Sequence, residues 1–228
     1  MLSKYVLLPA MLFDLHIHTI LSSCSRLIVE EAITRAKARG LDGICITDHN
    51  TMDIRHFLSE GIQDNGLCVI FGMEYCTAQG DFLLFGPFET LQPHLPADVL
   101  LNIVDQCGGV AVAAHPFRKG RSLDRRMIDE GRCCAIESLN GRNTPSENAA
   151  VEQWRQHFDL TECGGSDAHS IEEVATFATR FWGPVRTRSD LIHLLKNRLC
   201  QPEICPKICI DKPAYVPAVG NDLFNPPH

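Results

Sequence analysis

The order of segments along the chain constrains its fold more than any other feature of the sequence. A short apolar run ends in a cluster of polar residues, a helical stretch usually follows, and the pattern then repeats. Strands are predicted over the apolar runs Met11–Leu15, Gly43–Thr47, Leu67–Phe71, Phe82–Phe85, Val110–Ala114, Cys134–Glu137, Leu160–Cys163 and Phe181–Val185. Continuous apolar strands that alternate with helices indicate a largely parallel sheet that is buried on both faces.

The stretches between these runs complete the expected fold. Helices are predicted over Val29–Arg39, Thr51–Gln63, Pro96–Cys107, Ser146–Phe158 and Ser189–Leu199. Six or seven strand–helix units in a chain of 228 residues favour one α/β domain, folded as a closed, distorted, TIM-like (βα)7 barrel. We place this domain at residues 1–199, and we expect residues 200–228, which contain several Pro and Cys, to form an irregular C-terminal extension.

The polar clusters contain an unusual concentration of titratable side chains. Five imidazoles and three carboxylates follow the predicted strands: His16, His18, Asp48, His49, Glu74, His115, Asp167 and His169. Because the C-terminal ends of barrel strands meet on one rim, these side chains should converge. Packing so many of them together costs desolvation and repulsion unless a cation lies among them. Imidazole and carboxylate ligands suit Zn²⁺, Mn²⁺ or Fe²⁺ better than Ca²⁺, so the sequence predicts a site for divalent transition metals.

The spacing of these residues supports a metal site. Alternate residues of a strand point to the same side, so His16 and His18 can hold one ion together. Asp167 and His169 repeat the same spacing, and Glu74 has two oxygens that could bridge two ions. A single His near a strand end is usually an ordinary hydrogen-bonded residue, so only the joint pattern is specific.

The motifs that carry these residues resemble those of the PHP (polymerase and histidinol phosphatase) superfamily. They are Asp14-Leu-His-Ile-His-Thr19, Thr47-Asp-His-Asn50, Glu74, Ala114-His-Pro116 and Gly165-Ser-Asp-Ala-His169. The resemblance implies a distorted barrel of about seven βα units and up to three divalent metals. It also implies that His16, His18, Glu74 and Asp167 hold one metal, that Glu74 and His115 hold a second, and that His49 and His169 belong to a third.

Two positions depart from the pattern of that superfamily. Ser23 or Cys24 stands where an acidic residue is expected, and Leu83 stands near the place of an expected His. Asp81, Glu137 or Cys24 could substitute for the missing ligands. The expected number of metals is therefore two or three.

The resemblance and the chemistry together predict a stand-alone metal-dependent phosphoesterase. We expect hydroxide, formed from metal-bound water, to hydrolyse a small phosphomonoester or a nucleotide. Arg118 and Arg142 follow predicted strands and are the expected phosphate-binding residues. His49 or His169 could protonate the leaving group wherever it is not occupied as a metal ligand.

Other functions remain open at this point. The chain could be an exonuclease for short oligonucleotides, or a regulatory PHP module that binds metal without catalysis. An amidohydrolase is less favoured, because no convincing metal-bridging Lys follows a strand. A net charge of −7 and a short span from Pro116 to Ser166 favour a small phosphorylated substrate over stable nucleic-acid binding.

The cysteines and the hydropathy bear on location. Eleven Cys is an odd number, and no apolar run approaches the roughly 20 residues that a membrane helix needs. We therefore expect a cytoplasmic protein with reduced thiols and no membrane segment. Cys200, Cys205 and Cys209 could form a metal site but lack a clear fourth ligand. The sequence makes no prediction of the oligomeric state.

Overall fold

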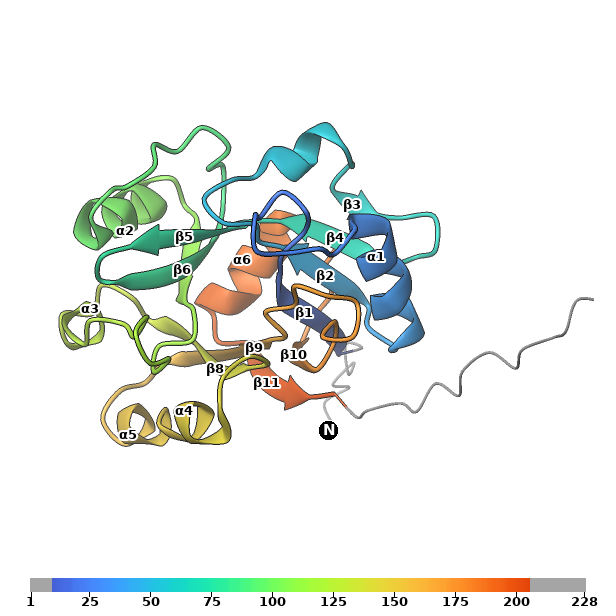
Figure 1. Ribbon diagram of the computed structural model, residues 1–228. Helices are drawn as coiled ribbons and strands as arrows, with labels where there is room; N and C mark the ends of the chain where they lie inside the picture. The colour runs from blue at the N-terminus through green and yellow to red at the C-terminus, as the bar shows by residue number, and fades with distance from the viewer. Residues whose placement is uncertain (1–9, 206–228) are drawn as a thin grey trace, which may run out of the picture.

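A computed structural model describes residues 10–205 (Figure 1). Its strands are β1 Met11–Ile17, β2 Gly43–Ile46, β3 Gly61–Ile62, β4 Cys68–Phe71, β5 Met73–Thr77, β6 Gly80–Phe85, β7 Val110–Ala113, β8 Ala135–Asn140, β9 Thr161–Gly165, β10 Phe177–Phe181 and β11 Cys200–Ile204. Its helices are α1 Val29–Ala38, the 3-10 turn η1 Asp53–His56, α2 Ala97–Gln106, α3 Arg126–Asp129, α4 Pro145–Ala149, α5 Glu152–Arg155 and α6 Arg188–Lys196. The fold is therefore mixed α/β, as the sequence predicts.

The strands form two sheets, and the prediction of a closed (βα)7 barrel is wrong. One sheet has the order β11-β10-β1-β2-β4-β3 and the other has the order β5-β6-β7-β8-β9. Between residues 10 and 205 the backbone bridges that join the two sheets are isolated ones, Ile17 with Ala168 and His49 with Glu74, and β9 also packs against β1, β10 and β11. Antiparallel pairing also interrupts the expected parallel order, at β5 with β6, β6 with β7, and β1 with β10.

Gly72 moves the chain from the first sheet to the second. It separates β4 from β5, and a Cβ at this position would lie 2.7 Å from the backbone oxygen of Leu84. Only glycine permits so close an approach to the neighbouring strand. This change of sheet brings the start of β5, with Glu74, beside the end of β2.

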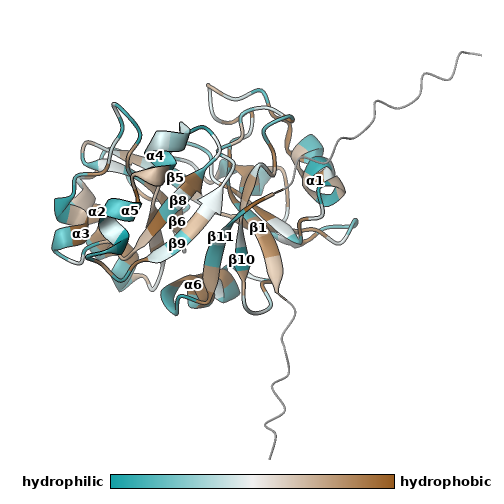
Figure 2. Ribbon diagram, turned by 90° about the horizontal axis from the view of Figure 1, so that it is seen from below, coloured by the Kyte–Doolittle hydropathy of each residue, from teal (hydrophilic) through white to brown (hydrophobic). Residues whose placement is uncertain are grey.

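The apolar residues divide between two layers. One core cluster fills the space between the sheets and includes Phe13, Leu83 and Phe181. The last helix, α6, adds Leu191 and Leu195 to it, and α6 lies between the two sheets in Figure 1. The larger cluster lies under the outer helices, and Figure 2 shows apolar strands with hydrophilic residues on the helices around them.

The helix α1 shows why the clearer sequence predictions are confirmed. Its buried residues are Val29, Ala32, Ile33 and Ala36, which recur at the spacing of one helical face. The predicted helices Pro96–Cys107 and Ser189–Leu199 are also present, as α2 and α6. Thr187 caps α6, in place of the predicted Ser189, and its side chain accepts a hydrogen bond from the Asp190 backbone N–H.

Other predicted elements are wrong. The helix predicted over Thr51–Gln63 is only the turn η1 followed by β3, because Met52 and Ile54 are buried but Phe57 is 71% exposed. The helix predicted over Ser146–Phe158 is broken into α4 and α5.

The strand predicted over Phe181–Val185 lies earlier in the chain, as β10. The extension expected from Cys200 onward begins with a regular strand, β11, which pairs with β10. Residues 206–228 lie outside the described part, so the division at residue 199 stays a prediction. No helix within residues 10–205 is both long enough and apolar enough to cross a membrane.

Candidate metal centre

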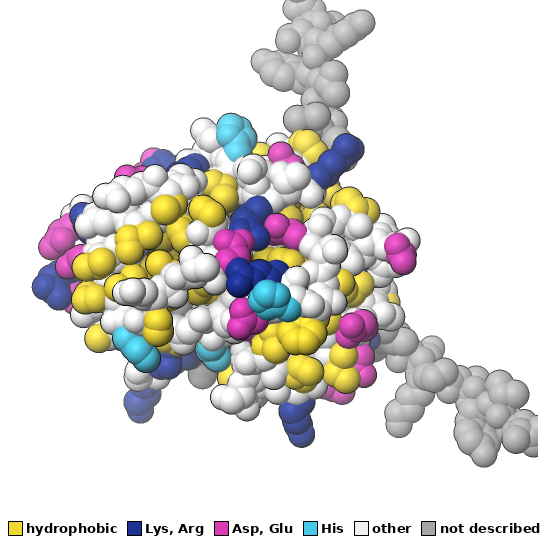
Figure 3. All heavy atoms as spheres, turned by 90° about the horizontal axis from the view of Figure 1, so that it is seen from above, with side chains coloured by type: hydrophobic (Ala, Val, Ile, Leu, Met, Phe, Trp, Pro, Cys, Tyr) yellow, Lys and Arg dark blue, Asp and Glu magenta, His cyan; other side chains and the backbone are white. Residues whose placement is uncertain are grey.

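All seven residues predicted as metal ligands lie together. They are His16, His18, His49, Glu74, His115, Asp167 and His169, and together with Asp81 they fall into three groups, two of which share His18, whose ligand atoms lie within 4.8 Å of one another inside each group. In Figure 3, basic, acidic and imidazole side chains gather near the centre of the face seen from above. The strand ends thus converge as the sequence predicts.

The first group contains His16, His18 and Asp167. The two imidazoles come from β1 and the residue after its end, and their Nε2 atoms are 3.0 Å apart. Asp167 follows β9, and its Oδ1 lies 3.6 Å from Nε2 of His16 and 3.4 Å from Nε2 of His18. Three ligand atoms from opposite sides of the fold therefore point to one small volume.

Glu74 lies between the groups. Its Oε2 is 3.2 Å from Nε2 of His18 and 2.9 Å from Nδ1 of His49. Its Oε1 is 2.8 Å from Nε2 of His115. The two oxygens of one buried carboxylate thus face different imidazoles, as a bridging ligand requires.

Asp81 belongs to the second group, and the sequence indicated it only as one of three possible substitutes for a missing ligand. It comes from β6, is 1% exposed, and completes a group with Glu74 and His115. Its Oδ2 lies 3.8 Å from Nε2 of His115. A carboxylate inside the otherwise apolar run of β6 was the available signal, because a buried carboxylate needs a partner.

The third group contains His18, His49 and His169. The ring of His18 lies between the other two, with centroids 4.3 Å from His49 and 4.4 Å from His169. His49 follows β2 and is the most open of the three, with 31% of its side chain exposed. The two residues predicted for leaving-group chemistry therefore lie at the mouth of the site.

Glu137 of β8 holds the imidazole of His16 and the backbone of His115. Its Oε1 is 3.0 Å from Nδ1 of His16, which leaves Nε2 of His16 available to a metal. Its Oε2 accepts hydrogen bonds from the backbone N–H of His115 and from the Asn140 side chain. Gly165 permits this packing, because a Cβ there would lie 2.6 Å from Cβ of His16 and 2.8 Å from Oε1 of Glu137.

Asp48, the third carboxylate of the rim, plays a different part. Its oxygens accept hydrogen bonds from the backbone N–H and hydroxyl of Thr19 and from the hydroxyl of Ser22. Asp48 belongs to none of the three groups found among the described residues. It holds the loop after β1 against the loop after β2.

The imidazoles and carboxylates of the site shift one another's pKa values strongly. Burial alone would lower the pKa of His16, but the carboxylates of Asp167, Glu137 and Glu74 outweigh it and hold that pKa well above its usual range. Burial alone would raise the pKa of Glu74, but the charge on His16 and the hydrogen bond from His115 hold it well below its usual range.

The two imidazoles at the mouth differ. The contact with the Cys76 thiol and the hydrogen bond to Glu74 raise the pKa of His49 to about 11. Burial and the nearby charge on His18 lower the pKa of His169 to about 4. The surroundings thus favour the protonated imidazole at His49 and the neutral imidazole at His169.

The two departures from the PHP pattern have different consequences. Leu83 is buried in the core between the sheets, and Asp81, on the same side of β6, reaches the site instead. Ser23 is exposed and belongs to none of the described ligand groups, whereas Cys24 lines the pocket without joining one. Cys209 lies outside the described residues, so a site with Cys200 and Cys205 stays a prediction.

Three arginines line an open pocket of about 350 Å³ together with five of the seven candidate ligands, whereas His16 and His18 are fully buried and do not line it. Nη2 of Arg118 lies 2.8 Å from Oδ2 of Asp167 and 2.7 Å from Oδ1 of Asn140. Arg121 forms a two-pronged ion pair with Asp81. Arg142 is exposed and makes no side-chain hydrogen bond or ion pair with residues 10–205. Both predicted phosphate-binding residues, Arg118 and Arg142, are thus at the site, but only Arg142 has no side-chain partner among residues 10–205.

The residues fit divalent metal ions. Two imidazole Nε2 atoms only 3.0 Å apart, with carboxylates of Glu74 and Asp167 around them, leave lone pairs directed at one volume. A cation relieves this repulsion, and Glu137 holds the tautomer of His16 that such an ion needs.

Two protein-family models match this chain. The model of the PHP domain matches residues 14–131, and that of the PHP-associated family matches residues 145–200. The chain belongs to the PHP family. The family accounts for the clusters of His, Asp and Glu, since PHP-like phosphoesterases are metal-dependent.

Two archaeal relatives of this PHP protein come from Methanocaldococcus jannaschii. The uncharacterized protein MJ1587 is 29% identical over 127 residues, which are 51% of this chain and 74% of the relative. The uncharacterized protein MJ0417 is 28% identical over 179 residues, which are 74% of this chain and 69% of the relative.

Solved structures share the fold. PsfC from Pseudomonas syringae has a TM-score of 0.72 and 23% identity, covering 86% of this chain and 92% of its own. A two-domain protein from Bacteroides vulgatus, with a predicted PHP-like metal-dependent phosphoesterase, has a TM-score of 0.67 and 19% identity, covering 86% and 65%. Endonuclease Q in complex with a duplex bearing an abasic lesion has a TM-score of 0.60 and 15% identity, covering 83% and 57%. The expectation that stable nucleic-acid binding is unlikely is therefore not supported.

Proposed function

We propose that this PHP protein is a metal-dependent phosphoesterase that hydrolyses a small phosphomonoester or a nucleotide. The observation that carries the proposal is that members of all three ligand groups line one pocket together with three arginines. Imidazoles and carboxylates hold cations, and arginines hold phosphate oxygens. The metals would be Zn, Mn or Fe, two or three in number, and the cytoplasm would be the place of action.

The chain's own residues have distinct tasks in this proposal. Two groups, His16–His18–Asp167 and Glu74–Asp81–His115, hold divalent ions, which when bound lower the pKa of water and so supply hydroxide near neutral pH. Arg142 binds the phosphate of the ester. Arg118 lines the same pocket as Arg142 and forms hydrogen bonds with Asp167 and Asn140, so it fixes the orientation of the Asp167 carboxylate.

His49 is the better candidate for the leaving-group acid. Its pKa is raised by Glu74 and Cys76, and its side chain is partly exposed to solvent. The pKa of His169 is lowered instead, and its Nδ1 forms a hydrogen bond with the backbone oxygen of Asp167. His49 can donate a proton only when it is not a metal ligand. His169 then acts as a ligand or as a neutral hydrogen-bonding group.

Replacing Arg142 with Ala should weaken substrate binding. Loss of one charge-assisted contact to phosphate, worth about 2 kcal/mol, should raise KM roughly 10- to 30-fold with a smaller change in kcat. Metal content should not change, because Arg142 contacts no candidate ligand. Steady-state kinetics and elemental analysis of Arg142→Ala and of Arg155→Ala, a surface control whose guanidinium pairs with Glu162, would check this. An unchanged KM in Arg142→Ala would remove this residue from the phosphate site.

The proposed function is tested by elemental analysis combined with a hydrolysis screen. We expect at least two metal ions per chain, and release of phosphate from phosphomonoesters in the presence of Mn²⁺. Metal without turnover of any ester would favour a regulatory module. Absence of bound metal after growth and assay in metal-supplemented buffer would contradict the proposal.

A nuclease activity is the second candidate. Endonuclease Q shares the fold and is described in complex with a DNA substrate, although at 15% identity the likeness concerns the fold alone. The same ligand groups and arginines suit a phosphodiester as well as a monoester. Cleavage of short oligonucleotides at a higher kcat/KM than any phosphomonoester would favour this alternative.

A further inference from the structure

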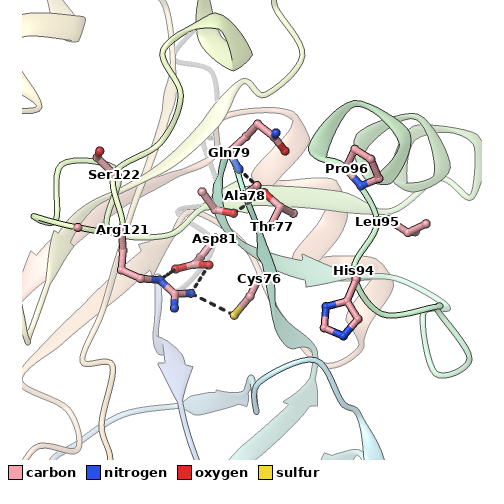
Figure 4. A pocket seen from close by; sticks show the side chains of 12 residues that line it. Cys76, Thr77, Ala78, Gln79, Asp81, His94, Leu95, Pro96, Arg121 and Ser122 are labelled. Carbon is pink, nitrogen blue, oxygen red and sulfur yellow. Dashed lines mark hydrogen bonds and ion pairs between the residues drawn. The ribbon is translucent and has the colours of Figure 1, made fainter.

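A second cleft adjoins the metal centre. It has a volume of about 490 Å³ and lies between the β5–β6 hairpin, the residues before α2 and the loop after β7. Figure 4 shows its lining, including Gln79, His94, Arg121 and Ser122. The cleft exceeds the metal pocket in volume and lies within the range of small-molecule sites.

The two pockets share a wall. Asp81 and Arg121 line both of them. Arg121 donates to both oxygens of Asp81 and, at 3.2 Å, to the thiol of Cys76 (Figure 4). The Arg121 side chain is 49% exposed although Asp81 is only 1% exposed, so the guanidinium stands at the boundary between the pockets. A molecule that reached the metal centre with one end would meet the cleft with the other.

The lining of the cleft is polar but almost neutral. Asp81 and Arg121 are the only carboxylate and guanidinium among the described residues that line it, and they neutralise each other. The imidazole of His94 and the hydroxyl of Ser122 make no hydrogen bond with residues 10–205, and the amide oxygen of Gln79 accepts one from the Ala97 backbone. Leu95 and Pro96 add apolar surface.

We infer that this cleft receives the uncharged, hydrogen-bonding organic part of the phosphate ester, and that His94 and Ser122 determine specificity for it. The inference rests on the proposed function, because it assumes that the phosphate end lies at the metal centre. A charged organic part is disfavoured, since no unpaired carboxylate or guanidinium of the described lining would balance it. Unpaired donors and acceptors beside apolar side chains instead suit a sugar or a nucleoside.

The test compares kcat/KM for three phosphate esters in the wild-type protein and in a variant whose cleft is filled by a tryptophan side chain. The wild-type protein, loaded with Mn²⁺, is assayed on adenosine monophosphate, a hexose phosphate and methyl phosphate. Two or three additional hydrogen bonds with partial burial should raise kcat/KM for at least one larger ester about 30-fold or more above methyl phosphate. The variant Ser122→Trp should lower that ratio at least tenfold, because its side chain occupies the cleft.

A second cleft variant and a control variant complete the test. His94→Asn keeps a residue that tolerates the positive φ of 63° at this position and removes the imidazole, so it should lower the same ratio several-fold. Ser59→Trp alters an exposed serine that does not line either pocket and should leave all three rates unchanged.

The outcomes separate the two proposals. Hydrolysis of methyl phosphate with no preference for a larger ester, or a preference that survives Ser122→Trp, would overturn the role of the cleft and leave the phosphoesterase intact. Failure of the metal-loaded protein to hydrolyse any of the three esters would instead overturn the phosphoesterase proposal, and with it the inference built upon it.

Discussion

Replacing Glu74 with Ala should abolish hydrolysis and release metal together. Its Oε2 faces His18 and His49 and its Oε1 faces His115, so one substitution removes a member of one ligand group and a carboxylate that faces imidazoles of the other two. Loss of metal ions that each stabilise the transition state by several kcal/mol should lower kcat/KM at least about 1,000-fold. Bound metal should fall to less than about half of the wild-type content.

The design of this experiment distinguishes a lost ligand from a lost fold. Glu74 is buried, so circular dichroism and thermal unfolding of Glu74→Ala must accompany the assays. Glu74→Gln preserves the volume and one oxygen, and should retain the fold with a similar loss of metal. Glu31→Ala, in the exposed first turn of α1, is the matched control and should behave as wild type. Full activity in Glu74→Ala would contradict a shared ligand at this position.

Replacing Asp14 with Ala should cause the largest loss of stability. The carboxylate is completely buried, and its oxygens accept hydrogen bonds from the backbone N–H groups of His16, Ser166 and Ala175. Leaving three buried donors unsatisfied costs about 1–3 kcal/mol for each. We expect a loss of about 3–6 kcal/mol in the free energy of unfolding, which urea titration would measure.

Asp14 also predicts a dependence of stability on pH in the metal-free protein. Burial raises the pKa of Asp14 from 3.8 to about 6, so between these values the folded state binds more protons than the unfolded state. The contribution of this group to stability is therefore greatest at low pH and declines as pH rises through 6, by about 3 kcal/mol in all.

The variant Asp14→Asn tests the sign of this effect. An amide keeps one acceptor oxygen and never ionises, so Asp14→Asn should gain stability relative to wild type as the pH rises from about 5 to 7.5, by about 1–2 kcal/mol. Urea unfolding in the presence of a chelator at both pH values would measure this. Asp64→Asn, at an exposed carboxylate, is the control. If the difference in the free energy of unfolding between wild type and Asp14→Asn does not change with pH, the raised pKa of Asp14 is contradicted.

The comparison of sequence and structure separates two kinds of information. Continuous apolar runs predicted most of the strands, and the spacing of Val29, Ala32, Ile33 and Ala36 predicted α1, because local periodicity reports which face is buried. The same reasoning failed over Thr51–Gln63, where a few apolar residues suggested a helix that tertiary contacts do not support.

The candidate site shows the same division. Strand-end motifs were sufficient to find His16, His18, Glu74, His115 and Asp167, since the C-terminal ends of neighbouring strands must meet. They were insufficient to choose between Leu83 and Asp81 on β6, because a one-strand pattern does not specify which residue reaches a site formed by other strands.

The sequence by itself therefore determined the family, the α/β class and the ligand types, all of which depend on residue identity and short-range spacing. Only the tertiary structure decided that two sheets replace a closed barrel, that Asp81 joins the ligand groups, that Arg118 is held by Asp167 while Arg142 is uncommitted, and that a neutral cleft adjoins the metal centre. These features depend on contacts between residues far apart in the chain. Strand pairing and long-range packing set such contacts, and no local pattern encodes them.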